Sequence, residues 1–463
     1  MPTPQPETEC PCGTEHPIVP REALVPFILV ASCFALWGML NMITDTLVPA
    51  VQKIFSISTE KSSYIQVVNY ASYALLAFPA AVFIKRFSYK AGVLLGLCLL
   101  SAGAIGFVPA GASHEFSPLL LTIAVMACGL SVLETSCNPY VLSMGHESTA
   151  VRRLNLAQTL NPVGCLAGLF VAKVLILGNL NPAEAAERAT WSAEKSKEVL
   201  SHELFYLALP YAIMVAVALG IVVTMLLRHM PEGRDHEHAP HVAESVKKLF
   251  ANKRYISGVA TQFFYVALQV SVWTYIIKYT REAAIISIDE AGKVVAPMKE
   301  HEAANMLIAS MVVFTVARMI CTALMKKFNP ASMMALLAAI GIGLTAAAIV
   351  LPGWAGVACL VALSGCMSLM FPTIYGIALR DLGHEVKLGA SGLIMAIIGG
   401  SAGAFAQGRL IDTLEHAGQR SDMAVRYSFV VPVVCLAVVL AYALAYRAFC
   451  ATAPKSSGPV ASH

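Results

Sequence analysis

Twelve long apolar stretches follow one another along the sequence, and they constrain the fold more than any other feature. They run approximately over residues 26–50, 64–85, 90–112, 117–143, 155–178, 204–228, 255–278, 303–325, 330–352, 355–379, 388–411 and 427–449. A helix needs about 20 mostly apolar residues to cross a bilayer. Lipid cannot satisfy backbone N–H and C=O groups, and the stretches are too long and too uniformly apolar for barrel strands. The sequence therefore predicts an all-α integral membrane protein with twelve transmembrane helices.

The composition agrees with this prediction and argues against other classes of protein. Of the 463 residues, 57% are apolar and 13% are charged, whereas a soluble protein is about 25% charged. The net charge of +4 gives no indication of a nucleic-acid partner. No nucleotide-binding loop, metal cluster or nucleophile motif is found, so we expect no enzymatic activity and no cofactor. We expect the protein to be a monomer in the lipid bilayer.

The cysteines do not form a disulfide framework, because most of the twelve lie inside apolar stretches, where cysteine is a small packing residue. Cys10 and Cys12 lie near His16 in the N-terminal tail. A metal site there is the weaker alternative, since the paired spacing of zinc ligands is missing. We therefore predict no metal site.

Basic residues in the short loops predict the orientation of the helices. The loops on one side hold Lys85, Arg86, Lys90, Arg152, Arg153, Lys247, Lys248, Lys253, Arg254, Lys326, Lys327, Arg380 and Lys387. The loops on the other side hold Lys53, Lys61, Arg188, Lys195, Lys197, Arg281, Lys293 and Lys299, some of them diluted by glutamates. Cytoplasmic loops carry the excess of Lys and Arg, so the first set is predicted to be inside, in a cell inner membrane. Twelve spans then place both termini in the cytoplasm. Residues 1–25 lack the features of a secretory signal and are predicted to be a cytoplasmic tail, as are residues 451–463.

A polar stretch at 229–252, which contains four histidines, divides the chain into halves at 26–228 and 253–450. The halves share a weak internal repeat of short motifs: Lys85-Arg86-Phe87 with Lys326-Lys327-Phe328, and Asn138-Pro139 with Phe371-Pro372. Two parallel six-helix repeats are the pattern of the major facilitator superfamily. We therefore expect two six-helix domains joined by a cytoplasmic linker.

Few ionisable residues lie inside the apolar stretches, and each is informative because an Asp at a helix centre costs roughly 2.5–3.5 kcal/mol on insertion scales. Asp45 lies toward the outer part of the first stretch, and Glu134 lies well inside the fourth. Asp45 could instead be solvated near the headgroups. Arg318 in the eighth stretch is interpreted as structural, paired with a carboxylate or a helix C-terminus.

Polar and aromatic residues near these carboxylates recur at helical spacing, so members of each set share a face. The sets are Trp37, Asn41, Thr44 and Asp45; Glu134 and Asn138; Gln158 and Asn161; and Gln262, Tyr265, Gln269 and Trp273. If these faces meet, they line a wet cavity that suits a sugar, because hydroxyls pair with amides and carboxylates while the apolar sugar face rests on Trp or Tyr. Gln158 and Asn161 could instead join helices, and Tyr265 and Trp273 could be packing residues.

Several motifs resemble those of the L-fucose:proton symporter family, and the resemblance runs in order from the first to the eleventh apolar stretch. They are Leu133–Tyr140 (LETSCNPY), Arg153–Thr159 (RLNLAQT), Phe87–Gly92 (FSYKAG), Gln262–Tyr265 (QFFY), Phe371–Ile374 (FPTI) and Ile397–Gly400 (IIGG). The resemblance implies that Glu134 contacts sugar, that Asp45 couples protonation to movement, and that Gln158 is a site residue. The chain departs from the family pattern at Met42 and Thr44, so hexoses other than L-fucose remain open.

Together these features predict a secondary transporter that imports a monosaccharide, L-fucose or a related hexose, with a proton by alternating access. Burial disfavours a charged carboxylate. If Asp45 is wet in one state and dry in the other, binding a proton therefore biases the equilibrium between them. Sodium coupling is an alternative, because Asn41, Thr44 and Asp45 could supply oxygen ligands. A non-transporting sugar sensor and an exporter of apolar drugs are further alternatives.

Overall fold

The computed structural model describes residues 17–55, 59–112, 115–181, 183, 185–188, 190–231, 242–283 and 300–451, and these contain helices but no strand. The helices before residue 232 are α1 (Leu24–Phe55), α2 (Thr59–Arg86), α3 (Tyr89–Ala112), α4 (Phe116–Ser143), α5 (Ala150–Gln158), α6 (Leu160–Val171), α7 (Ala185–Arg188) and α8 (Ala193–Leu227). Those after residue 241 are α9 (Val242–Ala251), α10 (Lys253–Ala283), α11 (Glu300–Leu324), α12 (Pro330–Val350), α13 (Trp354–Met367), α14 (Met370–Leu379), α15 (Val386–Met395), α16 (Gly399–His416), α17 (Ser421–Ser428) and α18 (Val430–Ala451). Short 3-10 or π turns lie at Arg21–Ala23, Glu147–Thr149, Ala172–Ile176, Leu177–Asn179, Gly383–Glu385 and Ala396–Ile398.

The prediction of twelve membrane-spanning segments is confirmed. Twelve helical spans of the described chain are long and apolar enough to cross a bilayer. Four of them are interrupted, where the sequence suggested continuous helices: Glu147–Ile176, Trp354–Leu379, Gly383–His416 and Ser421–Arg447. Proline lies just after two of these breaks, at Pro162 and Pro372. Because proline has no N–H and its ring collides with the carbonyl four residues earlier, it favours such breaks.

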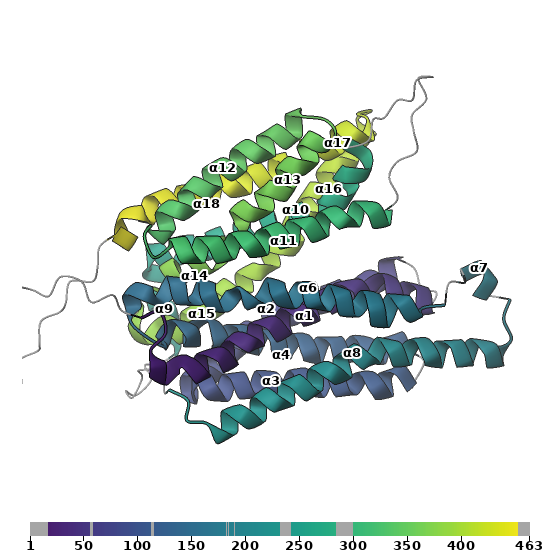
Figure 1. Cartoon of the computed structure of the whole chain (residues 1–463), viewed down its shortest axis with the longest axis horizontal. Helices are drawn as coiled ribbons and strands as arrows, with labels where there is room; N and C mark the ends of the chain where they lie inside the picture. The colour runs from purple at the N-terminus through teal and green to yellow at the C-terminus, as the bar shows by residue number, and fades with distance from the viewer. Residues whose placement is uncertain are drawn as a thin grey trace, which may run out of the picture.

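The spans form two bundles of six, which confirms the predicted fold class. Helices α1–α8 make up the first half and α10–α18 the second, and Figure 1 shows the two bundles side by side with α9 at one end. Within the first half, α3 packs on α4 and α8, and α1 packs on α6; within the second, α12 packs on α18 and α10 on α16. The exact boundaries at 26–228 and 253–450 stay a prediction.

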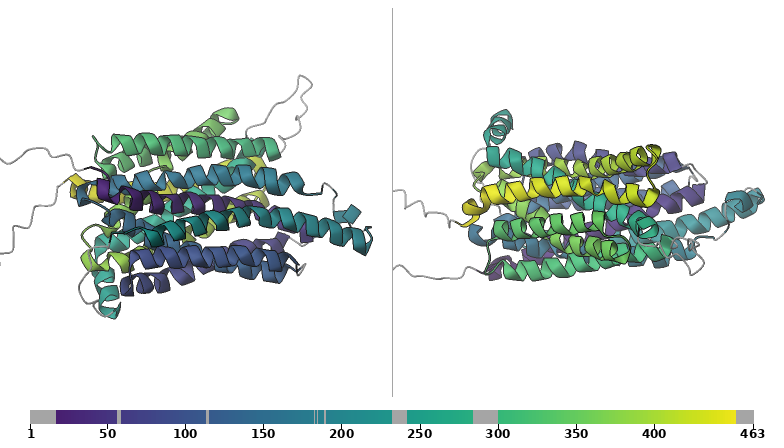
Figure 2. Two further views of the ribbon diagram at one scale, coloured as in Figure 1. Left: turned by 60° about the horizontal axis from the view of Figure 1, so that its bottom comes forward. Right: turned by 90° about the horizontal axis from the view of Figure 1, so that it is seen from above.

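The start of α1, helix α9 and the end of α18 lie at the same end of the bundle, which we call the terminal end, and α7 lies at the opposite end (Figures 1 and 2). At the opposite end, the long helix α8 extends beyond the other spans. It has 35 residues and begins about three turns before the apolar stretch predicted at 204–228. Its first turns therefore extend beyond the other spans toward α7.

Basic residues of the set predicted to be inside join the two halves at the terminal end. Lys85 of the first half is 3.4 Å from the Glu385 carboxylate of the second, and both side chains are largely buried. Lys85 Nζ also lies 2.5 Å from Ser245 Oγ in α9. Arg380 is 3.9 Å from Glu147. The buried Lys85–Glu385 pair and the more exposed Arg380–Glu147 pair therefore connect the two halves at this end.

Candidate functional site

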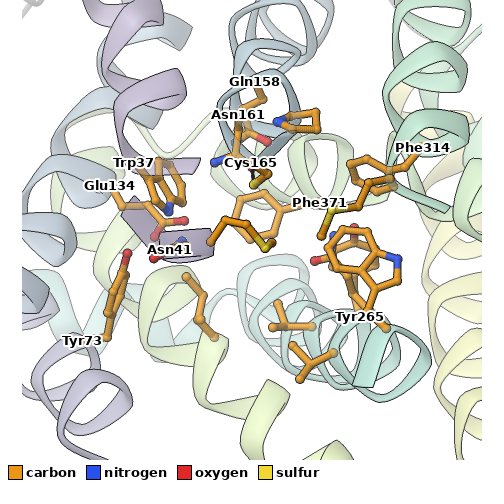
Figure 3. A pocket seen from close by; sticks show the side chains of 18 of the residues that line it. Trp37, Asn41, Tyr73, Glu134, Gln158, Asn161, Cys165, Tyr265, Phe314 and Phe371 are labelled. Atoms are coloured by element: carbon orange, nitrogen blue, oxygen red, sulfur yellow. Dashed lines mark hydrogen bonds between the residues drawn. The ribbon is translucent and has the colours of Figure 1, made fainter. Parts of the chain in front are cut away.

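A cavity of ≈ 220 Å³ lies between the two halves. Its lining from the first half is Trp37, Asn41, Met42, Asn69, Tyr70, Tyr73, Glu134, Gln158, Asn161, Pro162 and Cys165. Its lining from the second half is Tyr265, Val266, Gln269, Val270, Trp273, Met311, Phe314, Arg318, Phe371 and Ile397. In Figure 3, Glu134, Asn41 and Tyr73 lie together on one side of the cavity, and Phe314 and Tyr265 lie across from them.

The structure brings most of the predicted site residues together at this cavity. Those that line it are Trp37, Asn41, Glu134, Gln158, Asn161, Tyr265, Gln269 and Trp273. Asn138 is not among the lining residues; it is fully buried in α4, one turn after Glu134. Asp45 belongs to α1, but its side chain lies outside the described part of the structure. Cys10, Cys12 and His16 also lie outside the described residues.

Glu134 is the acidic side chain of the lining. It comes from the middle of α4 and is 1% exposed. Neither carboxylate oxygen has a hydrogen-bond partner among the described residues. A buried carboxylate without partners costs folding free energy, and charged groups inside membranes are expected to serve function. Glu134 is therefore free to accept hydrogen bonds from a molecule in the cavity.

Asn138 contacts the cavity-lining residue Gln158 rather than the cavity itself. Its Nδ2 donates to the Glu134 carbonyl one turn earlier at 3.0 Å. Its Oδ1 accepts a hydrogen bond from Gln158 Nε2 at 2.7 Å. With its donor group held by Asn138, the Gln158 amide is fixed in one orientation at the cavity. The sequence placed Glu134 and Asn138 on one face, but only packing separates the residue that lines the cavity from the one that supports it.

Glycines let α1 and α6 approach closely and bring their polar residues to the same wall. A Cβ at Gly164 would lie 2.0 Å from the Ala35 carbonyl oxygen, and one at Gly38 would lie 2.1 Å from that of Asn161. Small residues permit this kind of close helix packing in membranes. Asn161 Nδ2 also donates to the Phe34 carbonyl at 3.3 Å. Its amide is therefore partly used in joining helices, as the alternative interpretation held, although it also lines the cavity.

Arg318 donates hydrogen bonds to carbonyl groups at the helix breaks of both halves. Its Nη1 donates to the Gln158 carbonyl at 2.9 Å, and its Nε donates to the Ser368 carbonyl at 2.6 Å. These carbonyls lie four residues before Pro162 and Pro372, so each has lost its own helical N–H partner. Arg318 is therefore structural, as predicted, through the carbonyls of two broken helices. One of its two bonds crosses between the halves.

Aromatic rings form much of the cavity wall of the second half. Trp273 meets the Phe314 ring edge-on at a centroid distance of 5.2 Å, and its Nε1 donates to Ser364 Oγ at 3.3 Å. The Arg318 guanidinium lies 4.6 Å from the Phe314 ring centroid. The Tyr265 and Phe371 rings also meet edge-on, with their centroids 6.1 Å apart. Such edge-on and cation–π contacts hold the rings in fixed orientations.

Helix α2 also contributes to the cavity, which was not predicted from the sequence. Asn69, Tyr70 and Tyr73 all line the cavity. Their spacing of one and three residues in an otherwise apolar segment is the same signal that identified the polar stripes of the other helices. The apolar lining residues of the second half carry no such signal, because they look like any other membrane-helix residue. Met42, noted as a departure from the family pattern, is also a lining residue.

Comparison with known proteins places the chain among transporters. Residues 29–407 match the model of the Major Facilitator Superfamily. The chain is 37% identical to the L-fucose-proton symporter of Haemophilus influenzae, over 92% of this chain and 97% of that protein. It is 30% identical to the L-fucose-proton symporter of Escherichia coli, over 91% and 93%. The crystal structure of the transporter FucP in its outward conformation matches with a TM-score of 0.82 and 30% identity, over 94% of this chain and all of that one.

Proposed function

The chain belongs to the L-fucose:proton symporter family of the major facilitator superfamily, and from this premise we propose that it imports L-fucose or a related hexose with a proton. The observation that carries the proposal is the cavity between the halves, where the partnerless carboxylate of Glu134 faces a wall of aromatic rings. This combination fits a sugar, whose hydroxyls need polar partners and whose carbon face packs on rings.

The size and polarity of the cavity favour a monosaccharide over an apolar drug. Pockets for drug-sized ligands are about 300–1,000 Å³. This cavity is smaller, at ≈ 220 Å³, and carries a carboxylate and five amides. The amides belong to Asn41, Asn69, Gln158 and Asn161 in the first half, together with Gln269 in the second. In this proposal Glu134 and Gln158 contact sugar hydroxyls, and Asn138 acts by orienting Gln158.

Proton coupling is assigned to Asp45 and Glu134. In secondary transporters of this architecture, one half rocks against the other around a site near the midplane. A carboxylate that is dry in one state and wet in the other binds its proton with different affinity in each, so the proton and the sugar bias the same equilibrium. Sodium coupling through Asn41, Thr44 and Asp45 is the competing assignment.

The terminal end is assigned to one side of the membrane by its basic residues. This end holds the basic residues of the predicted inner loops, such as Lys85 and Arg380, so we assign it to the cytoplasm. Contacts between the halves close this end, which corresponds to a state open to the outside. The likeness to FucP in its outward conformation supports the assignment. An impermeant reagent that labelled a cysteine placed at Lys247 from outside intact cells would contradict it.

Counterflow of labelled sugars into proteoliposomes tests the function directly. The expected result is saturable exchange of L-fucose or a close hexose, with accumulation when the interior is more alkaline than the exterior. Accumulation that follows a sodium gradient instead would keep sugar transport and overturn the proton assignment. Binding without any exchange would favour a sugar sensor. If none of the labelled sugars bound, the proposal would be overturned.

A further inference from the structure

Two wholly buried polar side chains lie just beyond the cavity, toward the terminal end. Gln262 in α10 and Tyr375 in α14 are both 0% exposed. Among the described residues, no hydrogen-bond partner is found for either polar atom of the Gln262 amide or for the Tyr375 hydroxyl. Neither residue lines the cavity. Burying such groups unpaired is costly, and each case in a folded protein needs an explanation.

Gln262 is on the face of α10 that lines the cavity. Val266, Gln269 and Trp273 line the cavity and follow Gln262 at intervals of four, three and four residues, which keep one helix face. Helix α10 begins at Lys253, at the terminal end, and its second residue, Arg254, is 3.6 Å from the Asp381 carboxylate. Gln262 therefore continues the cavity-lining stripe one turn further toward the terminal end.

Tyr375 lies level with Gln262 on the neighbouring helix. Helices α10 and α14 pack together and run in opposite directions: Gly258 packs against Ala378, and Tyr265 contacts Phe371. Between these two contacts, the antiparallel register puts Gln262 beside the turn of α14 that contains Tyr375. The two unpaired groups thus occupy one level of the bundle, beneath the cavity.

Two aromatic rings separate this level from the cavity. Tyr265 and Phe371 both line the cavity, and their ring centroids are 6.1 Å apart. The Phe371 ring stacks on the Tyr375 ring at a centroid distance of 6.2 Å. Tyr375 also packs within a hydrophobic cluster that contains residues of both halves, and Glu134 lies within electrostatic reach of its hydroxyl. Tyr375 therefore lies at the seam, where the halves separate when the terminal end opens.

We propose that Gln262 and Tyr375 form an inner site that contacts the hydroxyls of the transported sugar when the protein faces inward. The inference rests on the proposed function. In the state described here the inner site is shut by the Tyr265–Phe371 pair, and its polar atoms stay unpaired. When the halves part at the terminal end, a sugar leaving the cavity passes these atoms, and an amide and a phenol offer both donors and acceptors to it.

The test measures half-saturation by L-fucose separately on the two faces of the membrane, in right-side-out and inside-out vesicles. In Gln262→Leu, the half-saturating concentration at the terminal-end face should rise about tenfold, as expected for loss of one good hydrogen bond. The value at the opposite face should stay within about twofold, because Gln262 does not line the cavity in that state. Tyr375→Phe should give a smaller rise on the same face.

Ser271→Ala provides a matched control. Ser271 is also a buried residue of α10 whose hydroxyl has no partner among the described residues. It lies nine residues from Gln262, which puts it on the opposite face of the helix. This variant should change neither half-saturation value. A change in Ser271→Ala equal to that in Gln262→Leu would show that loss of any buried polar group in α10 is sufficient, and would overturn the inner site.

The thermal stability of Gln262→Leu tests the premise independently of transport. Removing a buried amide without partners should leave the melting temperature unchanged or higher, whereas a fall would show that the amide is bonded in this state and would overturn the inference. If the half-saturating concentration in Gln262→Leu changed equally on both faces of the membrane, or on neither, the inner site would also be overturned. Neither result would argue against sugar transport by the unmodified protein. An unmodified protein that carries no sugar would overturn the proposed function and the inner site together.

Discussion

The two walls of the cavity differ in chemistry. The first half contributes the carboxylate of Glu134 and most of the amides, whereas the second half contributes mainly rings, aliphatic side chains and the guanidinium of Arg318. Hydrogen bonds discriminate between similar molecules more steeply than apolar contact does. From this difference we propose that the first half selects the sugar and that the second half covers it.

The largest effect is expected at the first wall, in Glu134→Ala. Loss of a charged hydrogen-bond acceptor costs about 1.5–3 kcal/mol, so L-fucose binding should weaken by about 100-fold at the upper part of that range. Counterflow should fall with it. Glu134→Gln, which keeps the shape, should recover part of the affinity. Unchanged binding by calorimetry in Glu134→Ala would show that this carboxylate is structural and would remove the main contrast between the walls.

Asp45→Asn separates coupling from recognition within the first half. The amide imitates a permanently protonated carboxyl, so exchange of sugar, which needs no net proton movement, should continue. Accumulation needs release of the proton. A pH difference of one unit, which supports about tenfold accumulation with one proton per sugar, should therefore drive none in the variant. If the variant still accumulates sugar when the interior is alkaline, coupling belongs to Glu134 or to another ion.

Trp273→Leu probes the second wall. Its ring is held by Phe314 and Ser364 rather than by the first half. Loss of aromatic contact costs about 0.5–1.5 kcal/mol, so binding should weaken by about fivefold, well below the effect of Glu134→Ala. Calorimetry on the two variants compares them directly. A Trp273→Leu effect as large as that of Glu134→Ala would break the assignment of recognition to the first half.

The smallest effect is expected for Pro162→Ala, which alters the bond that links the walls. The new N–H competes with Arg318 for the Gln158 carbonyl, a bond that crosses between the halves. Weakening one such bond should shift the equilibrium away from the state closed at the terminal end by about threefold. Pulsed EPR distances across the terminal end would report the shift.

Pro372→Ala is the matched control for Pro162→Ala. It frees the Ser368 carbonyl from Arg318 in the same way, but this bond lies within the second half. The distances across the terminal end should therefore change little. Equal shifts in the two variants would mean that the bond between the halves has no special part in the equilibrium.

Features that depend on the cost of each residue in lipid could be predicted from the sequence alone. The twelve spans, and the rarity within them of ionisable residues such as Asp45 and Glu134, follow from that cost, because it acts locally and needs no knowledge of neighbours. The two halves were predicted from a polar stretch and recurring short motifs. Helical spacing also placed Glu134, Gln158 and Gln269 on polar faces, and these residues meet at the cavity. The roles of these residues, and the position of the Asp45 side chain, stay predictions.

Tertiary structure decided which polar residues line the cavity and which support it. Asn138 shares a face with Glu134, yet its amide is used within the wall. Arg318 finds its acceptor at Gln158, 160 positions away in the sequence. Such pairings depend on how helices from different halves approach and rotate against one another. Spacing within one helix carries no information about the partner helix, so only the packed bundle could show that the carbonyls freed by two prolines meet one arginine.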